Sequence, residues 1–125
     1  MNSKRKGSLA VGHAIAYFIN NNCSVFIPVS DCDKYDLVID QNGSFQKVQC
    51  KYSGSKAKSG GFIVDLRTFG GYRDKTYYIR YGKDDFNLLF VYCSNGDKYL
   101  IPEEKVRNMS GLAVGGKSWN EYKLS

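Results

Sequence analysis

The stretch that decides the fold is "YDLVIDQNGSFQKVQCKY", Tyr35 to Tyr52, in which two strand-like runs flank the pair Asn42-Gly43. Asn-Gly is the strongest short-range signal for a two-residue hairpin turn, because both turn residues must adopt positive φ. The sequence therefore predicts an antiparallel hairpin here, and the turn fixes the register of its two strands.

In that register Gln41 pairs with Ser44, and Asp36 lies opposite Gln49. Directly opposed side chains on one face have Cβ atoms about 4.5–5.5 Å apart, and Lys51 emerges on the same face about 7 Å farther along its strand. Asp36, Gln49 and Lys51 are thus predicted to form one polar cluster. The other face of the hairpin is a suitable core side and takes Leu37, Ile39, Val48 and Cys50.

This polar cluster combines a carboxylate, an amide oxygen and a lysine. Hard oxygen ligands of this kind, together with a backbone carbonyl, hold Mg²⁺, which keeps waters and takes further ligands from phosphate oxygens. A metal-bound water is acidified and can attack phosphorus, while a nearby ammonium orients that water or stabilises the developing charge. The cluster is therefore a candidate site for phosphodiester hydrolysis. On geometry alone the alternative is a surface Asp–Lys pair with a polar neighbour, worth less than about 1 kcal/mol.

Around the hairpin the sequence predicts further elements of an α+β domain. One helix is expected over residues 7–22, and its apolar stripe at three- and four-residue spacing comprises Leu9, Val11, Ala14, Ile15, Phe18 and Ile19. "SVFIPV", residues 24–29, is predicted as a short strand, and Pro28 favours a position at the sheet edge.

Downstream of the hairpin the sequence predicts mostly strands. "SGSKAKSGG" is expected to be a flexible basic loop, "FIVDLRT" a strand, "FGGYRDK" a further loop and "TYYIRY" another strand. "KDDF" is predicted as a turn, and "SNGD" joins "NLLFVYC" to "KYLIP" in a second hairpin. After Pro102 "EEKV" favours a short helix, and the glycine-containing tail is left open between a loop and a last strand. We expect residues 1–125 to form a single domain around a mixed sheet.

Composition restricts the class of protein. Eighteen Lys and Arg against twelve Asp and Glu give a net charge of +6, and 42% hydrophobic with 14% aromatic content excludes a disordered basic tail. A basic globular domain of this kind favours a polyanionic partner, the alternative being a charge that serves solubility. No apolar run reaches about 18 residues and the first residues lack a signal-peptide profile, so we expect a soluble, cytoplasmic protein without a membrane partner.

The four cysteines do not predict a metal centre. Cys23, Cys32, Cys50 and Cys93 have irregular spacings without a C-x-x-C pair, and His13 is the only imidazole. We interpret them as reduced thiols that behave as small hydrophobes.

The spacing of Asp36 and Gln49-Cys50-Lys51, after a helix and "VFIPVSDCDKYDLVID", resembles the PD-(D/E)XK nuclease superfamily. The similarity is to a branch like the group I intron-associated homing endonucleases, and it extends to "KGSLAVGHAIAYF", "KVQCKY", "DLRTFGGYRDK" and "LLFVYCSNGDKYLIP". The resemblance implies a restriction-endonuclease-like core, with the first helix packed on a mixed sheet. It also implies a metal-dependent endonuclease that hydrolyses double-stranded DNA, of homing type or otherwise site-specific.

The resemblance assigns roles to the hairpin residues. Asp36 would be the principal metal ligand, the Cys50 backbone carbonyl a second, and the Gln49 amide oxygen would bind the metal or its water. Lys51 would position the nucleophile. The implied cofactor is Mg²⁺, with Mn²⁺ as a possible substitute.

Two departures from the family pattern concern charge. Gln49 stands where the usual pattern has a second acid, and residues 4–22 contain no Asp or Glu, although many relatives supply a Glu near the position of Ala10 or Val11. Ser8 and His13 are candidate accessory residues toward a metal-bound water, and His13 also toward a phosphate. The alternative for His13 is an ordinary surface or half-buried residue.

Basic side chains elsewhere are candidates for DNA contacts, namely Lys6, Lys56, Lys58, Arg67, Arg73 and Lys75. Arg67 and Arg73 flank paired glycines that allow a close backbone approach, as an element inserted into the major groove would need. Each cluster alone has a solvated face as its alternative. Because duplex targets often have two-fold symmetry, we expect a homo-dimer or higher homo-oligomer.

Two other functions remain open. A catalytically inactive DNA-binding module would explain Gln49 and the acid-free first helix, but retention of Lys51 argues against it. A basic RNA-binding or protein-interaction domain would explain the charge and the tyrosines, and leaves the Asp36, Gln49 and Lys51 cluster as coincidence.

Overall fold

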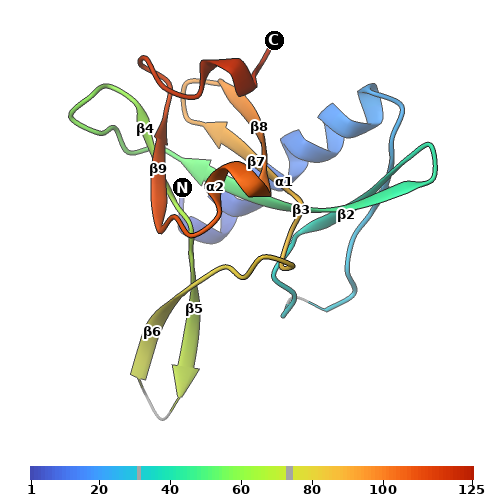
Figure 1. Cartoon of the computed structure of the whole chain (residues 1–125), viewed down its shortest axis with the longest axis horizontal. Coiled ribbons are helices and arrows are strands. Elements are labelled where there is room, and N and C mark those ends of the chain that lie inside the picture. Colours follow the sequence, from blue (N-terminus) through green and yellow to red (C-terminus); the bar gives the residue numbers. More distant parts are fainter. Residues whose placement is uncertain (31, 73–74) are drawn as a thin grey trace.

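The computed structural model describes residues 1–30, 32–72 and 75–125 and is drawn in Figure 1. Its helices are α1 (Ser3–Asn20) and α2 (Glu103–Val106), followed by the 3₁₀ helix η1 (Asn120–Tyr122). Its strands are β1 (Ser24–Phe26), β2 (Leu37–Gln41), β3 (Ser44–Ser53), β4 (Phe62–Asp65), β5 (Arg67–Tyr72), β6 (Lys75–Arg80), β7 (Leu88–Cys93), β8 (Lys98–Pro102), β9 (Gly111–Val114) and β10 (Lys123–Leu124).

The central sheet is mixed. Six strands follow the order β1-β2-β3-β7-β8-β10, in which β3 and β7 run parallel and the other neighbours run antiparallel. The prediction of an α+β fold around a mixed sheet is therefore confirmed. The short strand β1 lies at one edge, as Pro28 indicated.

The turn at Asn42-Gly43 forms as predicted. Asn42 has φ 54° and Gly43 has φ 87°, and the Gly43 N–H donates to the Asp40 carboxylate at 2.8 Å. Gln41 pairs with Ser44 and Leu37 with Val48, which confirms the register.

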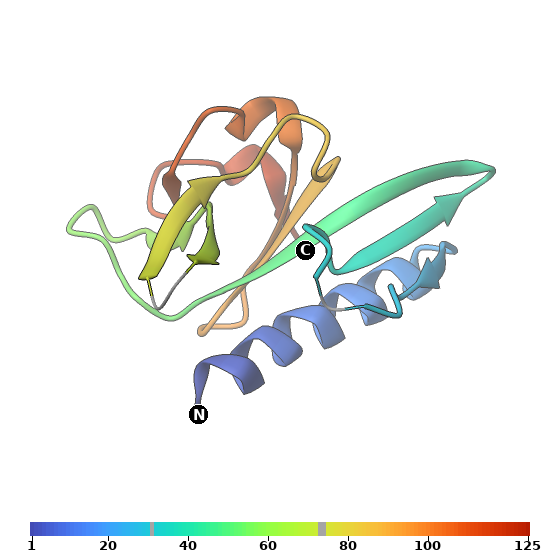
Figure 2. The ribbon, with the colours of Figure 1, turned by 90° about the horizontal axis from the view of Figure 1, so that it is seen from below.

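Helix α1 covers one face of the sheet, along the β2-β3 hairpin (Figure 2). Ala10, Ala14 and Phe18, at four-residue spacing, are its buried positions and pack on strand residues that include Leu37, Ile39, Val48, Cys50 and Phe90. The predicted start at Gly7 is wrong, because the Asn2 side chain accepts the Arg5 N–H at 2.9 Å and begins the helix at Ser3. Ile19 was expected in the apolar stripe but is 58% exposed.

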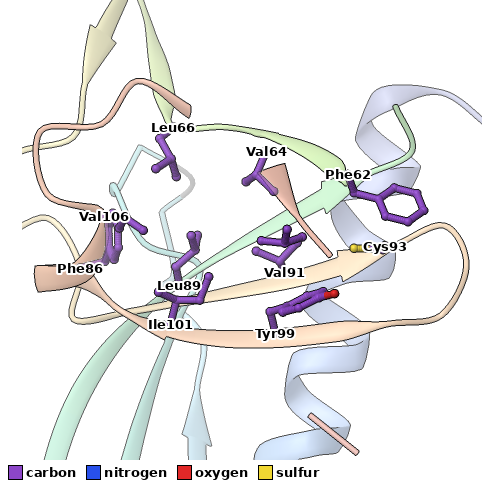
Figure 3. Close-up of a cluster of buried hydrophobic side chains, with 11 residues drawn as sticks. Phe62, Val64, Leu66, Phe86, Leu89, Val91, Cys93, Tyr99, Ile101 and Val106 are labelled. Atoms are coloured by element: carbon purple, nitrogen blue, oxygen red, sulfur yellow. The ribbon is translucent and has the colours of Figure 1, made fainter. Parts of the chain in front are cut away.

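A second core lies on the opposite face of the sheet (Figure 3). There the β4-β9 pair and α2 cover β7 and β8, and the short helix predicted for "EEKV" is confirmed. The buried residues of this core are Phe62, Val64, Leu66, Phe86, Leu89, Val91, Cys93, Tyr99, Ile101, Val106 and Val114. The two cores hold the sheet from both sides, so the strands that carry the polar cluster are fixed in position.

The prediction is wrong between residues 62 and 75. The single predicted strand is two, β4 and β5, and the predicted loop "FGGYRDK" begins inside β5, which pairs with β6 from Arg67 with Arg80 to Tyr72 with Lys75. Paired glycines favour a loop in sequence, but a partner strand supplies the hydrogen bonds that hold Gly70 and Gly71 extended. This β5-β6 hairpin extends away from the main body in Figure 1, and Arg73 and Asp74 lie outside the described residues.

In the described part of the chain, no helix is long and apolar enough to cross a membrane. Cys23, Cys50 and Cys93 are free and buried, and Cys32 is free and exposed. The three buried thiols therefore pack like small apolar side chains.

The close fit between α1 and the sheet predicts an asymmetric response to two alanine substitutions. Ala14 is completely buried against the sheet, so Ala14→Leu should lower the free energy of unfolding by about 1–3 kcal/mol through overpacking. Ala16 is exposed on the same helix, so Ala16→Leu should change it by less than about 0.5 kcal/mol. Urea unfolding measures both values, and equal effects would contradict the tight packing of α1.

Candidate active site

Asp36 directly precedes Leu37, the first residue of β2, and lies beside β3. Its backbone N–H donates to the Val48 carbonyl at 2.8 Å, and its carboxylate Oδ2 accepts the Cys50 N–H at 2.8 Å. β2 begins only at Leu37, so no backbone carbonyl of β2 reaches the Cys50 N–H. The Asp36 carboxylate accepts this N–H instead. Asp36 is therefore held by two hydrogen bonds to one strand.

The Cys50 carbonyl faces the same open edge of β3. In a strand, the N–H and C=O groups of one residue point to one side, and those of the next residue point to the other. The carbonyls of Lys47 and Ser53 accept the backbone N–H groups of Asn87 and Ser94, so these odd-numbered residues point to the β7 side. Cys50 has the opposite parity, and its N–H meets Asp36. Its side chain packs under α1, where burial raises the pKa of the thiol. The oxygen of Cys50, and not its sulfur, is thus directed to the site.

The pKa of Asp36 is raised from its ordinary value of 3.8, and the largest cause is burial of the carboxylate. The hydrogen bond from the Cys50 N–H and the positive charge of Lys51 lower it in part, without cancelling the effect of burial. The ionised form of Asp36 is therefore incompletely compensated by the protein. A cation bound at this carboxylate would complete the compensation.

Gln49 is 7% exposed and lies on the face of β3 opposite α1. Its amide nitrogen donates to the Lys34 carbonyl at 3.0 Å, which fixes the orientation of the amide. Its amide oxygen Oε1 accepts no hydrogen bond from any of the described residues. The amide oxygen is thus the atom of Gln49 with remaining acceptor capacity.

Lys51 is half-buried, two residues beyond Gln49 on the same face. Its ammonium lies 5.2 Å from the centroid of the Tyr81 ring and acts electrostatically on both Asp36 and Asp65. Asp65, at the end of β4, is a neighbour that the sequence did not indicate. The lowered pKa of Asp65 is due first to the side-chain hydrogen bonds from Arg67, at 3.0 Å.

A pocket of about 260 Å³ opens beside Asp36. Its walls include Val11 of α1, Asp33 and Tyr35, together with the loop at residues 27–30. Ala10 is completely buried under the helix, so of the two positions that the sequence left open for a helix carboxylate, Val11 is the one that faces this pocket. The apolar side chain of Val11 thus forms part of the wall of this pocket.

Ser8 and His13 do not line the Asp36 pocket. They line a separate hollow of about 280 Å³ on α1, with Leu9, Gly12 and Ala16. The His13 ring stacks on Tyr92 with centroids 3.9 Å apart and planes 10° apart. This contact supports the half-buried packing alternative for His13.

The predicted DNA-contacting residues lie in different parts of the fold. Two have aromatic neighbours, since the Lys6 ammonium lies 5.7 Å from the Tyr52 ring and the Lys56 ammonium lies 5.3 Å from the Phe62 ring. Lys58 is exposed. Arg67 and Lys75 lie on the β5-β6 hairpin, where Arg67 forms the ion pair with Asp65, and Arg73 lies outside the described residues.

Within residues 1–30, 32–72 and 75–125, no group of three or more His, Cys, Asp and Glu side chains could hold a metal ion. The donors that the sequence predicted here are the Asp36 carboxylate and the amide and carbonyl oxygens of Gln49 and Cys50, and Asp33 adds a second carboxylate to the wall of the Asp36 pocket. All of these are hard oxygen donors, which suit Mg²⁺ better than the softer metals.

Helix α1 packed on a mixed sheet that contains the Asn-Gly hairpin is the restriction-endonuclease-like arrangement that the sequence resemblance implied. The sequence model of the PD-(D/E)XK endonuclease family matches residues 1–114, and the chain belongs to this family. The resemblance in the sequence is confirmed, and with it the nuclease class. Enzymes of this family generally use divalent metals.

A solved structure supports the same branch. The chain is similar to the bacterial homing endonuclease I-Ssp6803I, with 26% sequence identity and a TM-score of 0.83 over 98% of this chain and 89% of that one. No curated protein matches the sequence.

The raised pKa of Asp36 predicts a pH-dependent gain of stability when the charge is removed. Ionisation is less favourable in the folded than in the unfolded state, so wild-type stability falls as pH rises from the ordinary value of 3.8 through the raised folded value. Asp36→Asn keeps an oxygen for the Cys50 N–H, and should raise Tm by a few degrees at pH 7 and by nothing below pH 3.8.

Thermal unfolding in EDTA at several pH values measures this difference without bound metal. Glu121→Gln removes an exposed carboxylate and serves as the control, with an expected change below about 0.5 kcal/mol. A lower Tm for Asp36→Asn at neutral pH would contradict the interpretation of Asp36 as an uncompensated charge.

Proposed function

We propose that this chain is a metal-dependent endonuclease that hydrolyses phosphodiester bonds of double-stranded DNA at specific sites, as a homing endonuclease does. Mg²⁺ is the proposed cofactor, and Mn²⁺ its substitute. The observation that carries the proposal is the half-buried Asp36 carboxylate, fixed by the Cys50 N–H at 2.8 Å and under the positive charge of Lys51. Family membership and the similar homing endonuclease support it.

The residues that would hold the metal are Asp36, through its carboxylate, Cys50, through its carbonyl, and Gln49, through Oε1. Their oxygen chemistry fits Mg²⁺, which retains several waters when few protein ligands are present. A bound Mg²⁺ would acidify a water and neutralise phosphate charge. Gln49 and Cys50 are neutral, so Asp36 supplies the negative charge of this donor set.

Lys51 supplies the positive charge for the reaction. An ammonium on the same face as Asp36 and Gln49 can donate hydrogen bonds to the attacking water or to a phosphate oxygen. Its half-buried position strengthens these interactions relative to those of a lysine in bulk water.

The net charge of +6 suits duplex DNA. We propose that the phosphate backbone or bases of DNA are contacted by Lys6, Lys56, Lys58, Arg67, Arg73 and Lys75. Arg67 and Lys75 lie on the β5-β6 hairpin, which extends away from the main body (Figure 1). Because duplex targets often have two-fold symmetry, we propose at least a homo-dimer. The exposed Phe26 and Phe45 rings, 6.1 Å apart, support an apolar contact between copies. A DNA substrate also supports an intracellular location.

One observation favours an alternative function, a catalytically inactive DNA-binding module. Val11 places an apolar side chain in the pocket of Asp36, and Gln49 replaces the second acid, so the site has a single carboxylate from these positions. A site with less charge binds a divalent ion more weakly.

Nicking and linearisation of supercoiled plasmid test the endonuclease. In Mg²⁺ or Mn²⁺, Asp36→Asn and Lys51→Met should each lower the cleavage rate at least about 100-fold, because one removes the charge that binds metal and the other the ammonium that stabilises the reacting groups. Lys117→Met, which removes an exposed lysine in a turn, should cleave like the wild type.

A second measurement separates the two functions. Gel shifts with duplex DNA in Ca²⁺ should leave binding by Asp36→Asn within a few-fold of the wild type. Plasmid left intact by the wild type in both metals, with salt-sensitive DNA binding, would instead establish the binding module.

Restoring a carboxylate at the helix position should strengthen metal binding. Val11→Glu adds a negative oxygen ligand to the pocket of Asp36, and we expect half-maximal cleavage at about tenfold lower Mg²⁺ concentration, comparable to the effects of neighbouring groups on metal affinity. Ala16→Glu adds the same charge to an exposed position of α1 and should leave the Mg²⁺ dependence unchanged. An identical Mg²⁺ titration for wild type and Val11→Glu would exclude Val11 from the metal site.

A further inference from the structure

Lys51 is held by an aromatic ring. Its ammonium lies 5.2 Å from the centroid of the Tyr81 ring, and both side chains are half-buried. Among the described residues, the ion pairs within 4.0 Å do not include Lys51. The nearby carboxylate of Asp65 is engaged at both oxygens by Arg67. The face of Tyr81 is therefore the ring contact that the structure gives this ammonium.

The ring of Tyr81 is itself fixed by the core. It packs edge-on against Phe86, with centroids 5.3 Å apart and planes 83° apart, and Phe86 is 2% exposed. Tyr81 follows the end of β6 directly, where Arg80 donates to the Asn108 carbonyl at 2.8 Å. A ring with these constraints presents its face to Lys51 in one orientation.

We propose that Tyr81 is a positioning residue for Lys51, and that it holds the ammonium by a cation–π contact in the orientation needed for cleavage. The inference rests on the proposed function of Lys51. A ring face attracts the ammonium without a hydrogen-bond acceptor, so the three N–H donors stay available to a water or a phosphate oxygen. A salt bridge would engage some of those donors.

Other lysines of the described chain also lie near rings, but in different settings. Lys6, Lys47 and Lys56 lie 5.7, 5.7 and 5.3 Å from the ring centroids of Tyr52, Tyr35 and Phe62. Lys47 also donates to the Asp84 carbonyl. Lys51 differs in that its charge acts on the half-buried carboxylate of Asp36.

Single-turnover cleavage with saturating enzyme tests the proposal. Tyr81→Phe keeps the ring and should cleave within about twofold of the wild type, whereas Tyr81→Leu should lower the rate about tenfold at unchanged DNA affinity in Ca²⁺. In a Lys51→Met background, Tyr81→Leu should have no further effect on cleavage. The matched control is Tyr122→Leu, the same change at a half-buried tyrosine packed against the same core.

An NMR measurement tests the contact independently of activity. The ring should shift the Lys51 ε-methylene resonance upfield in wild type and Tyr81→Phe, and this shift should disappear in Tyr81→Leu. If the leucine variant does not fold, a series of fluorinated phenylalanines at residue 81 keeps the shape while weakening the negative face of the ring. Cleavage should then decline stepwise with fluorination.

The outcomes separate this inference from the proposed function. Absence of cleavage by the wild type, with the ring shift present, would refute the nuclease and with it the catalytic purpose of the contact. Two outcomes with an active wild type would refute the positioning role alone. In the first, Tyr81→Leu cleaves as fast as the wild type. In the second, Tyr81→Leu lowers the cleavage rate by the same factor in the Lys51→Met background as in the wild type. A missing ring shift in the wild type would refute the contact.

Discussion

The two-residue turn at Asn42-Gly43 is the constraint on which the rest of the site depends. It sets Leu37 opposite Val48, and the next position places the Asp36 carboxylate on the Cys50 N–H. A slip of one residue would exchange the faces of the strand, sending Gln49 and Lys51 under α1. The positive φ of Asn42 and Gly43 therefore determines which side chains meet in the site.

The site also shows a conflict between stability and function. Asp36 is buried enough for its pKa to be raised, and Gln49 is 7% exposed with its amide nitrogen engaged by Lys34. Folding thus half-buries a carboxylate whose negative charge the protein compensates only in part. In the proposed function a cation from outside the chain completes the compensation. The apolar cores on both faces of the sheet supply the stability that makes this burial tolerable.

Local signals in the sequence predicted the hairpin and its register, because both rest on neighbouring residues. The mixed sheet was predicted from the order of the elements, and its parallel pair joins the distant strands β3 and β7. Local signals did not predict β5, since Gly70 and Gly71 favour a loop unless a partner strand is present. They also did not decide whether Ala10 or Val11 faces the Asp36 pocket, because this depends on how α1 is rotated about its axis on the sheet. Asp65 and Tyr81 reach Lys51 through long-range packing, which short-range patterns do not encode.

This difference in range has a consequence for how the site works. Gln49 and Lys51 lie on β3, and Asp36, directly before β2, is tied to the same strand by its hydrogen bonds to Val48 and Cys50. Tyr81 and Asp65 instead adjoin the two strands of the β5-β6 hairpin, where Arg67 pairs with Arg80. The Asp36 carboxylate is therefore placed by local hydrogen bonds to β3, whereas the surroundings of the Lys51 ammonium depend on residues that adjoin the β5-β6 hairpin.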